Sequence, residues 1–410
     1  MTSPVKATLL PGEEIKAVAD PPMGGAGTAT DEQINDRYIR GEVRIVVEQA
    51  RYQLKQIPTL VASSDYDLQP SFQRRPRWSR VKQSRLIESF IINVPVPPVF
   101  LYESELSRYE VMDGKQRLTA IEEFYADRFP LEGLREWSEL NGRKYSTLPE
   151  QIRRGIDRRY LSSIVLLHET GKSEAQAEEL KQLVFERINT GGEDLSDQET
   201  RNALHSGPFN SLCIELSRYP SFCQLWQIPQ PDADELSKNP DWLPSRELSD
   251  NSMYRTMEDV QTVLRFFAHR QRDKLWKGGS NLDSYLTSYL VAANRFSPEV
   301  LVGLKSVFQK TMDTIVEVLD EYAFLPYRKR GDDWYYLAKP SFVLYEPLSF
   351  AFSQLLGYRS ELYANRSLIM DRLPQFYIEN ASAFDGRKVN SSDVRERDRL
   401  ALDFLSGFVS

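Results

Sequence analysis

The stretch that decides the fold of this chain is Tyr109–Ile121, which reads YEVMDGKQRLTAI. Its first residues alternate apolar and polar up to Asp113, which is the pattern of a β-strand with one buried face. Gly114 then breaks the pattern, and the residues that follow carry apolar side chains at helical spacing. The stretch therefore predicts a strand over 108–113, a tight turn and a helix over 115–126.

The same turn has the chemistry of an anion site. A helix start presents backbone N–H groups and the positive end of the helix dipole, and Gly114 would let a bulky anion approach the backbone closely. Lys115 and Arg117 add two positive charges, so the site suits a phosphate. Gln116 would orient a water molecule or bond a phosphate oxygen. Asp113 would hold a metal ion or a polarised water.

A purely structural interpretation of this turn is also open. Asp113 and Gln116 have the D-x-x-Q spacing of a capping box, in which each side chain caps the backbone of the other residue. Under that interpretation, Lys115 and Arg117 are solvated surface charges. The pentapeptide alone does not decide between the two.

An arginine-rich stretch upstream, QPSFQRRPRWS over 69–79, interleaves guanidinium groups with aromatic rings. Such a pattern contacts nucleic-acid phosphates and stacks on bases. The alternative is a basic surface loop that an aromatic side chain anchors in the core. The candidate nucleic-acid or nucleotide residues of this region are Gln73, Arg74, Arg75, Arg77, Trp78 and Arg80.

A third stretch, VFERINTGG over 184–192, places Arg187 and Asn189 at the end of an expected helix. These polar side chains near a Gly-Gly turn are candidate site residues. The alternative is an ordinary helix end, in which Gly191 or Gly192 takes the left-handed conformation without any ligand.

Composition limits the function classes. The chain has 410 residues, 41% hydrophobic and 27% charged, which is ordinary for globular domains. Its net charge of −7 means that any nucleic-acid contact comes from a local basic patch. Cys213 and Cys223 are expected to be buried thiols, because their spacing fits neither a disulfide framework nor a zinc site. No signal peptide or membrane-length apolar run is seen, so a cytoplasmic protein is expected.

The pattern along the chain predicts an α+β fold. We expect a mobile tail over 1–34, a small mixed domain over 35–205 and an all-helical domain over 206–410. Helices are expected over 43–55, from Ser79 as N-cap, over 148–159 and over 174–189, with strands near 99–103 and 161–169. Further expected features are a capping box of Ser196 with Glu199, and a helix with Ser297 as N-cap and Pro298 in its first turn.

Taken together and in order, these motifs resemble one family. It is the N-terminal domain of GmrSD-type, modification-dependent restriction enzymes, also called domain of unknown function 262. The resemblance rests on Gln73–Arg74 with Trp78, LIESFIINVPVPPVFL, DGKQR over 113–117 and FERINTGGEDLSDQETRNAL, and it spans roughly 65–205. The family usually has D-G-x-Q-R, most often DGQQR, so Lys115 stands where glutamine is common.

The resemblance implies a ParB and sulfiredoxin-like fold that binds a nucleoside triphosphate, with Mg²⁺ as a second cofactor at Asp113. It implies that Asp113, Gln116 and Arg117 are catalytic. Residues that would bind the nucleotide are Gly114, Lys115, Gln73, Arg74, Arg187 and Asn189. DNA is the expected partner, and oligomeric state is left open.

Relatives that cut DNA usually carry a C-terminal, histidine-based nuclease domain. This chain has three histidines, His168, His205 and His269, and none lies in a His-Asn-His-like cluster. DNA cleavage would therefore need another set of catalytic groups or a nuclease partner chain. The leading hypothesis is a nucleotide-hydrolysing component of a prokaryotic or phage-related restriction and defence system. A ParB-like DNA-binding or DNA-cleaving protein without nucleotide turnover, and a non-catalytic interaction subunit, remain as alternatives.

Overall fold

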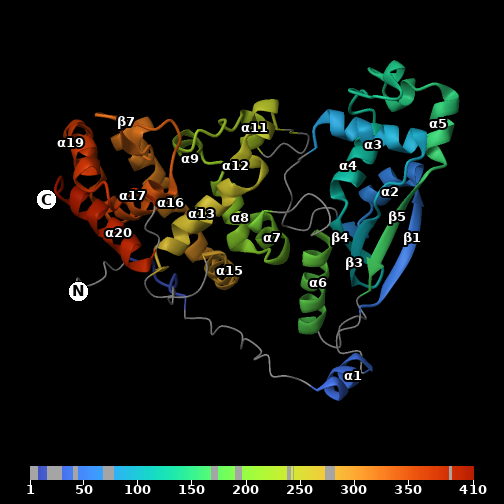
Figure 1. Cartoon of the computed structure of the whole chain (residues 1–410), viewed down its shortest axis with the longest axis horizontal. Helices are drawn as coiled ribbons and strands as arrows, with labels where there is room; N and C mark the ends of the chain where they lie inside the picture. Colours follow the sequence, from blue (N-terminus) through green and yellow to red (C-terminus); the bar gives the residue numbers. More distant parts are fainter. Residues whose placement is uncertain are drawn as a thin grey trace. The chain divides into compact units, whose positions relative to one another are not determined.

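The computed structural model describes residues 8–15, 30–39, 45–67, 78–167, 174–189, 196–237, 242, 244–272, 282–386 and 390–410. The chain forms two compact units (Figure 1). The N-terminal unit spans Asp20–Leu195, and the second, here called the helical unit, spans Met1–Ala19 and Ser196–Ser410. The mixed unit is therefore inserted, in sequence, into the helical one.

A five-stranded mixed sheet organises the N-terminal unit, in the order β1-β5-β3-β4-β2. β1 is antiparallel to β5, β5 is parallel to β3, β3 is antiparallel to β4, and β4 is parallel to β2. Figure 1 shows the longer strands side by side. Their bounds are β1 Val47–Gln53, β2 Tyr66–Asp67, β3 Val99–Glu105, β4 Arg108–Asp113 and β5 Tyr160–Leu166.

One face of the sheet carries the core of this unit. Val111, Leu101 and Val165 face this core, where they meet apolar side chains of α3 and α4 such as Ile87 and Phe124. The opposite face meets α6. The helices are α1 Asp31–Ile39, α2 Ile57–Ala62, α3 Arg80–Ile92, α4 Lys115–Tyr125, α5 Glu150–Asp157 and α6 Glu174–Asn189, with 3-10 turns Leu54–Gln56, Ser138–Leu140 and Tyr145–Thr147.

Several local predictions for this unit are confirmed. The Ser79 side chain accepts a hydrogen bond from the Lys82 N–H and caps α3. The strand up to Asp113 and the helix from Lys115 form as the sequence indicated. Helix α6 has the predicted bounds. These elements are set by neighbouring residues, which explains why local patterns find them.

The helix predicted over 43–55 is wrong. Within this segment the structure has strand β1, Val47–Gln53, paired along its length with β5. Its apolar residues fit helical and strand spacing about equally well, and pairing with a distant strand decided the outcome. Pro58 also lies inside the first turn of α2, where a proline is tolerated, rather than ending a helix.

The helical unit packs around α16, Pro298–Leu319, which contacts α8, α9, α17, α18 and α19. Ser297 caps α16 and Pro298 lies in its first turn, as predicted. The capping box of Ser196 with Glu199 also forms. The other helices are α7 Asp197–Leu204, α8 Pro208–Leu216, α9 Pro220–Leu225, α10 Ala233–Leu236, α11 Arg246–Asp250, α12 Ser252–Arg255, α13 Glu258–His269, α15 Leu282–Ala293, α17 Phe342–Gln354, α18 Arg359–Ala364, α19 Arg366–Glu379 and α20 Ser391–Ser406, with 3-10 turns Asp320–Tyr322 and Leu356–Tyr358.

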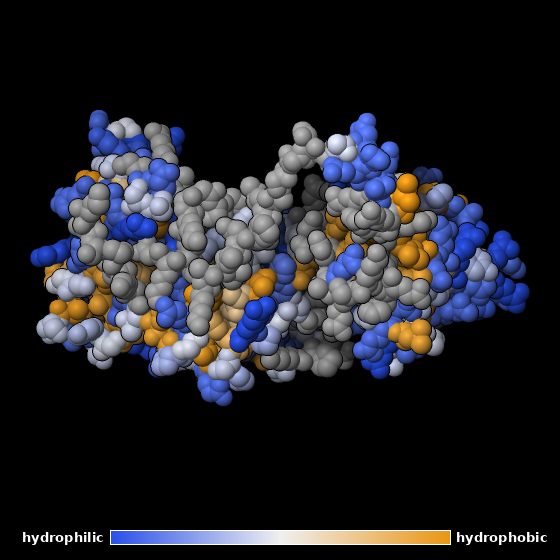
Figure 2. Space-filling model, turned by 90° about the horizontal axis from the view of Figure 1, so that it is seen from below, coloured by the Kyte–Doolittle hydropathy of each residue, from blue (hydrophilic) through white to orange (hydrophobic). Residues whose placement is uncertain are grey.

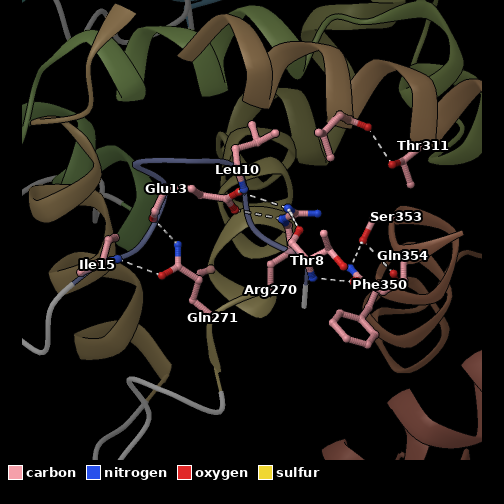
Figure 3. Close-up of polar contacts among 12 residues, drawn as sticks. Thr8, Leu10, Glu13, Ile15, Arg270, Gln271, Thr311, Phe350, Ser353 and Gln354 are labelled. Atoms are coloured by element: carbon pink, nitrogen blue, oxygen red, sulfur yellow. Dashed lines mark hydrogen bonds and ion pairs between the residues drawn. The ribbon is translucent and has the colours of Figure 1, made fainter. Parts of the chain in front are cut away.

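Two features of this unit depart from the sequence-based prediction. It contains a β-hairpin, β6 Tyr327–Arg330 with β7 Asp333–Tyr336, and is therefore not all-helical. Residues 8–15 do not behave as a tail, because Glu13 is fully buried and bonded to Arg270 (Figure 3). The fold as a whole is mixed α and β, with the five-stranded sheet in the N-terminal unit and a largely helical second unit.

Across the described part of the chain, no helix combines the length and the apolar character that crossing a bilayer requires.

Candidate functional site

The turn between β4 and α4 has a conformation that favours glycine. Gly114 is the N-cap of α4 and has a φ of 98°, in the left-handed region. A Cβ at this position would lie 2.4 Å from Cγ1 of Val99, a buried residue of β3. Positive φ and this close approach together require a residue without a side chain. The turn is therefore fixed by Gly114.

Arg117 is held by an acceptor on each side of the turn. Its Nη2 donates to Asp113 Oδ2 at 2.7 Å and to the Pro98 carbonyl oxygen at 3.1 Å. The side chains of Arg117 and Asp113 are 14% and 25% exposed. Nε of Arg117 is buried, and no described atom accepts a hydrogen bond from it. A buried N–H without an acceptor costs free energy, so this donor is a local cost of holding Arg117 in the turn.

The capping-box alternative for this turn is wrong. Asp113 ends β4 and bonds the Arg117 guanidinium, while the N-cap is Gly114 and no side chain caps the helix. Lys115 and Gln116 lie half-buried in the first turn of α4. A helix start without a capping side chain, with a lysine and an arginine in its first turn, keeps the character of an anion site.

Arg187 lies against the sheet face opposite α4. With apolar residues of four strands and of α6 it lines a cavity of about 440 Å³, a size typical of ligand pockets. Met112 also lines this cavity, so the pocket begins one residue before Asp113 but on the other side of β4. Lys181 of α6 bonds Glu110 at 2.7 Å and thereby ties the helix to β4.

The remaining predicted residues are placed as follows. Gln73, Arg74, Arg75 and Arg77 lie outside the described residues, as does the side chain of Asn189, whose backbone ends α6. Trp78 packs half-buried against the core of the N-terminal unit. Arg80 bonds Glu123 and Gln83 and stacks over Phe129 at 4.9 Å. These contacts explain Trp78 and Arg80 without a nucleic acid.

The structure also brings together two segments, of which the sequence indicated only the basic run RRGIDRR over 153–159, as support for a DNA-binding surface. Arg51 and Lys55 lie at the end of β1, and Arg158 and Tyr160 lie at the start of β5. The two segments are more than 100 residues apart in the chain. The one available signal was the basic run around Arg158, whose significance depends on a strand pairing that sequence patterns do not reveal.

The histidines and acidic residues do not form a metal centre among the described residues, because no three or more His, Cys, Asp or Glu side chains converge there. His269 is buried and its Nε2 lies 2.8 Å from Asp398 Oδ1. His205 follows α7, and its carbonyl oxygen accepts a bond from Asn294. His168 lies outside the described residues.

Fold and turn together define a class: a mixed α/β domain in which a strand passes through a glycine into a helix start that carries a fixed arginine. Residues 57–206 match the family described as GmrSD restriction endonuclease, N-terminal domain, and this chain carries a domain of that family. Searches of curated proteins and of solved structures found no match. The match includes the turn between β4 and α4 and the whole of α6, and it ends two residues after α7.

Proposed function

We propose that this protein is a nucleotide-binding and nucleotide-hydrolysing component of a restriction-type, DNA-related system. The family match associates its N-terminal unit with restriction endonucleases. The single observation that carries the nucleotide part is Arg117, held by Asp113 at a helix start that begins with glycine and has no side-chain cap. A guanidinium fixed beside helix-start N–H groups binds a phosphate with little reorganisation.

The residues of the turn have distinct roles in this proposal. The Arg117 guanidinium, whose side chain is 14% exposed, donates to a phosphate oxygen, and Lys115 neutralises part of the developing charge. Gln116 positions the attacking water. Asp113 orients Arg117 through the 2.7 Å contact. Each of these side chains belongs to the turn or to the first turn of α4, so one short element sets the geometry.

Mg²⁺ fits this turn only together with phosphate. Asp113 is one carboxylate and already bonds Arg117. Magnesium sites of nucleotide enzymes often use one or two carboxylates and complete the coordination with phosphate and water. Asp113 would therefore be the protein ligand, and the bound ion would neutralise phosphate charge.

The test is release of inorganic phosphate from a panel of nucleoside triphosphates with Mg²⁺, with and without duplex DNA. We expect Arg117→Ala to lower the rate by about 10²–10³-fold, because loss of one charge-stabilising donor typically has this effect. Nucleotide affinity, measured by calorimetry, should fall as well. Circular dichroism establishes that the variant is folded.

The matched control is Arg399→Ala, which removes another arginine that pairs with a carboxylate four residues away, here Asp403 in α20. Its rate should equal that of the wild type. A wild-type rate for Arg117→Ala would refute the role assigned to Arg117. If no nucleotide releases phosphate, the proposal of hydrolysis is refuted. If no nucleotide binds in calorimetry, the hypothesis of a non-catalytic interaction subunit is favoured.

A further inference from the structure

The corner where β1 ends and β5 begins gathers exposed basic side chains. Gln53 pairs with Tyr160 in the sheet register, and Arg51 pairs with Ser162. The Leu54 N–H donates to the Arg159 carbonyl oxygen at 2.9 Å, which ties the turn after β1 to the end of α5. Figure 1 shows α5, β1 and β5 at the same end of this unit. We call Arg51, Lys55, Arg158 and Tyr160 the basic corner.

The cations of the basic corner are not neutralised by described carboxylates. Arg51, Lys55 and Arg158 are exposed, and none forms an ion pair with a described acidic residue. The nearest acid in sequence, Asp157, accepts hydrogen bonds from the hydroxyls of Tyr125 and Tyr145 instead. In a chain with a net charge of −7, exposed cations without acidic partners form a local positive field.

Tyr160 places a hydroxyl among these cations. Its side chain is 50% exposed, and the Arg51 guanidinium lies 5.7 Å from the centre of its ring. Gln53 Nε2 donates to the Tyr160 hydroxyl oxygen at 3.0 Å, which orients the hydroxyl hydrogen away from Gln53. Arginine, lysine and tyrosine hydroxyl groups are common donors to the phosphates of DNA.

The sheet register places the basic corner at the same end of the sheet as the Asp113 turn. Asp113 pairs with Phe100, and Phe100 pairs with Ile164, four residues after Tyr160. At about 3.3 Å per residue and about 4.8 Å per strand, the two sites lie roughly 15 Å apart.

We propose that the basic corner binds the phosphate backbone of double-stranded DNA. Arg51, Lys55 and Arg158 each contact a phosphate, and the Tyr160 hydroxyl donates to one of the same oxygens. The contact is independent of base sequence, because it is made to phosphates alone. This inference rests on the DNA-related part of the proposed function and does not depend on nucleotide hydrolysis.

The test is fluorescence anisotropy of a labelled duplex oligonucleotide at several salt concentrations, with the full chain and no nucleotide. We expect the triple variant Arg51→Gln, Lys55→Gln, Arg158→Gln to bind on the order of 100-fold more weakly at low salt. The slope of log affinity against log salt should become shallower by about 3, one for each lost phosphate contact. Tyr160→Phe removes only the hydroxyl and should weaken binding less than the triple variant.

The matched control changes three exposed cations of the helical unit, Lys310→Gln, Lys329→Gln and Arg330→Gln, which alters the net charge equally. Control and wild type should bind alike. An unchanged affinity and salt slope in the basic-corner variant would overturn the proposal, as would tighter binding of single-stranded DNA or duplex RNA than of duplex DNA. Phosphate release without DNA should be unaffected in the basic-corner variant, so a failure of this inference is distinguishable from a failure of the proposed hydrolysis.

Discussion

At the scale of single residues, the turn between β4 and α4 depends on Gly114 and Arg117 for different reasons. Gly114 is required by conformation and by the closeness of Val99. Arg117 is positioned by two acceptors, Asp113 and the Pro98 carbonyl, while its Nε lacks one. The glycine thus makes the turn possible, and the arginine gives it its charge.

Gly114→Ala is expected to destabilise the N-terminal unit strongly. The left-handed backbone costs an alanine roughly 1–2 kcal/mol, and the overlap with buried Val99 adds about 1–3 kcal/mol. Urea unfolding followed by circular dichroism measures the loss. Gly142→Ala is the control, because Gly142 has a φ of 84° but no atom within 4 Å of its Cβ position. Equal losses for the two variants would show that Val99 moves aside without cost.

At the scale of elements, α13, α17 and α20 are joined by a buried ionic cluster. Arg265 of α13 bonds Glu346 of α17, and His269 of α13 contacts Asp398 of α20. Burial alone would raise the pKa of Glu346, but Arg265, His269 and Arg272 outweigh it and lower this pKa to about 2. The Glu346 carboxylate therefore stays charged and holds its cationic neighbours in place.

His269 should make the stability of the helical unit depend on pH. Burial alone would lower its pKa, but Asp398 and then Glu346 outweigh burial and raise it above the ordinary 6.5. Since the folded state binds the proton more tightly, this contribution is fully present below pH 6.5 and is lost as the pH rises through the folded pKa. The urea concentration at the midpoint of wild-type unfolding should therefore fall as the pH is raised from below 6.5.

His269→Gln is the comparison for this pH dependence. It removes the titrating group, so the decline above pH 6.5 should flatten. A decline as steep in the variant as in the wild type would assign the effect to other groups.

At the scale of the whole molecule, the chain begins in the helical unit, forms the sheet unit and then returns. Residues 8–15 lie against α13 and α17 (Figure 3). Both carboxylate oxygens of Glu13 bond Arg270 at 3.1 Å, and the Gln271 side chain bonds the Glu13 backbone.

Figure 2 shows that the end of the sheet unit carrying α5 is largely hydrophilic.

Glu13→Gln should destabilise the helical unit by about 3–5 kcal/mol, because it leaves the buried charge of Arg270 without its counter-ion. Thermal unfolding by calorimetry gives the loss. The control is the same substitution at Glu215, whose pair with Lys305 is exposed and is expected to contribute less than about 1 kcal/mol. A Glu13→Gln variant as stable as Glu215→Gln would mean that the buried Glu13–Arg270 ion pair contributes no more than an exposed pair.

The sequence by itself determined the features that neighbouring residues fix. The strand up to Asp113, the glycine turn, the caps at Ser79, Ser196 and Ser297, and the bounds of α6 all follow from side chains within a few positions of one another. Motif order also indicated the family of the N-terminal unit, which the family match confirms. Such features are predictable because caps, turns and amphipathic periods are local interactions.

Only the tertiary structure decided the features that depend on distant partners. Segment 47–53 became a strand because β5, more than 100 residues away, pairs with it, and the same pairing created the basic corner. Asp113 bonds Arg117 rather than capping α4, because Gly114 takes the N-cap and the Pro98 carbonyl, directly before β3, also accepts from Arg117. Glu13 bonds Arg270, which lies 257 residues later in the chain. Strand pairing and side-chain burial between distant segments produce no periodic pattern in the sequence. A single sequence therefore does not reveal them.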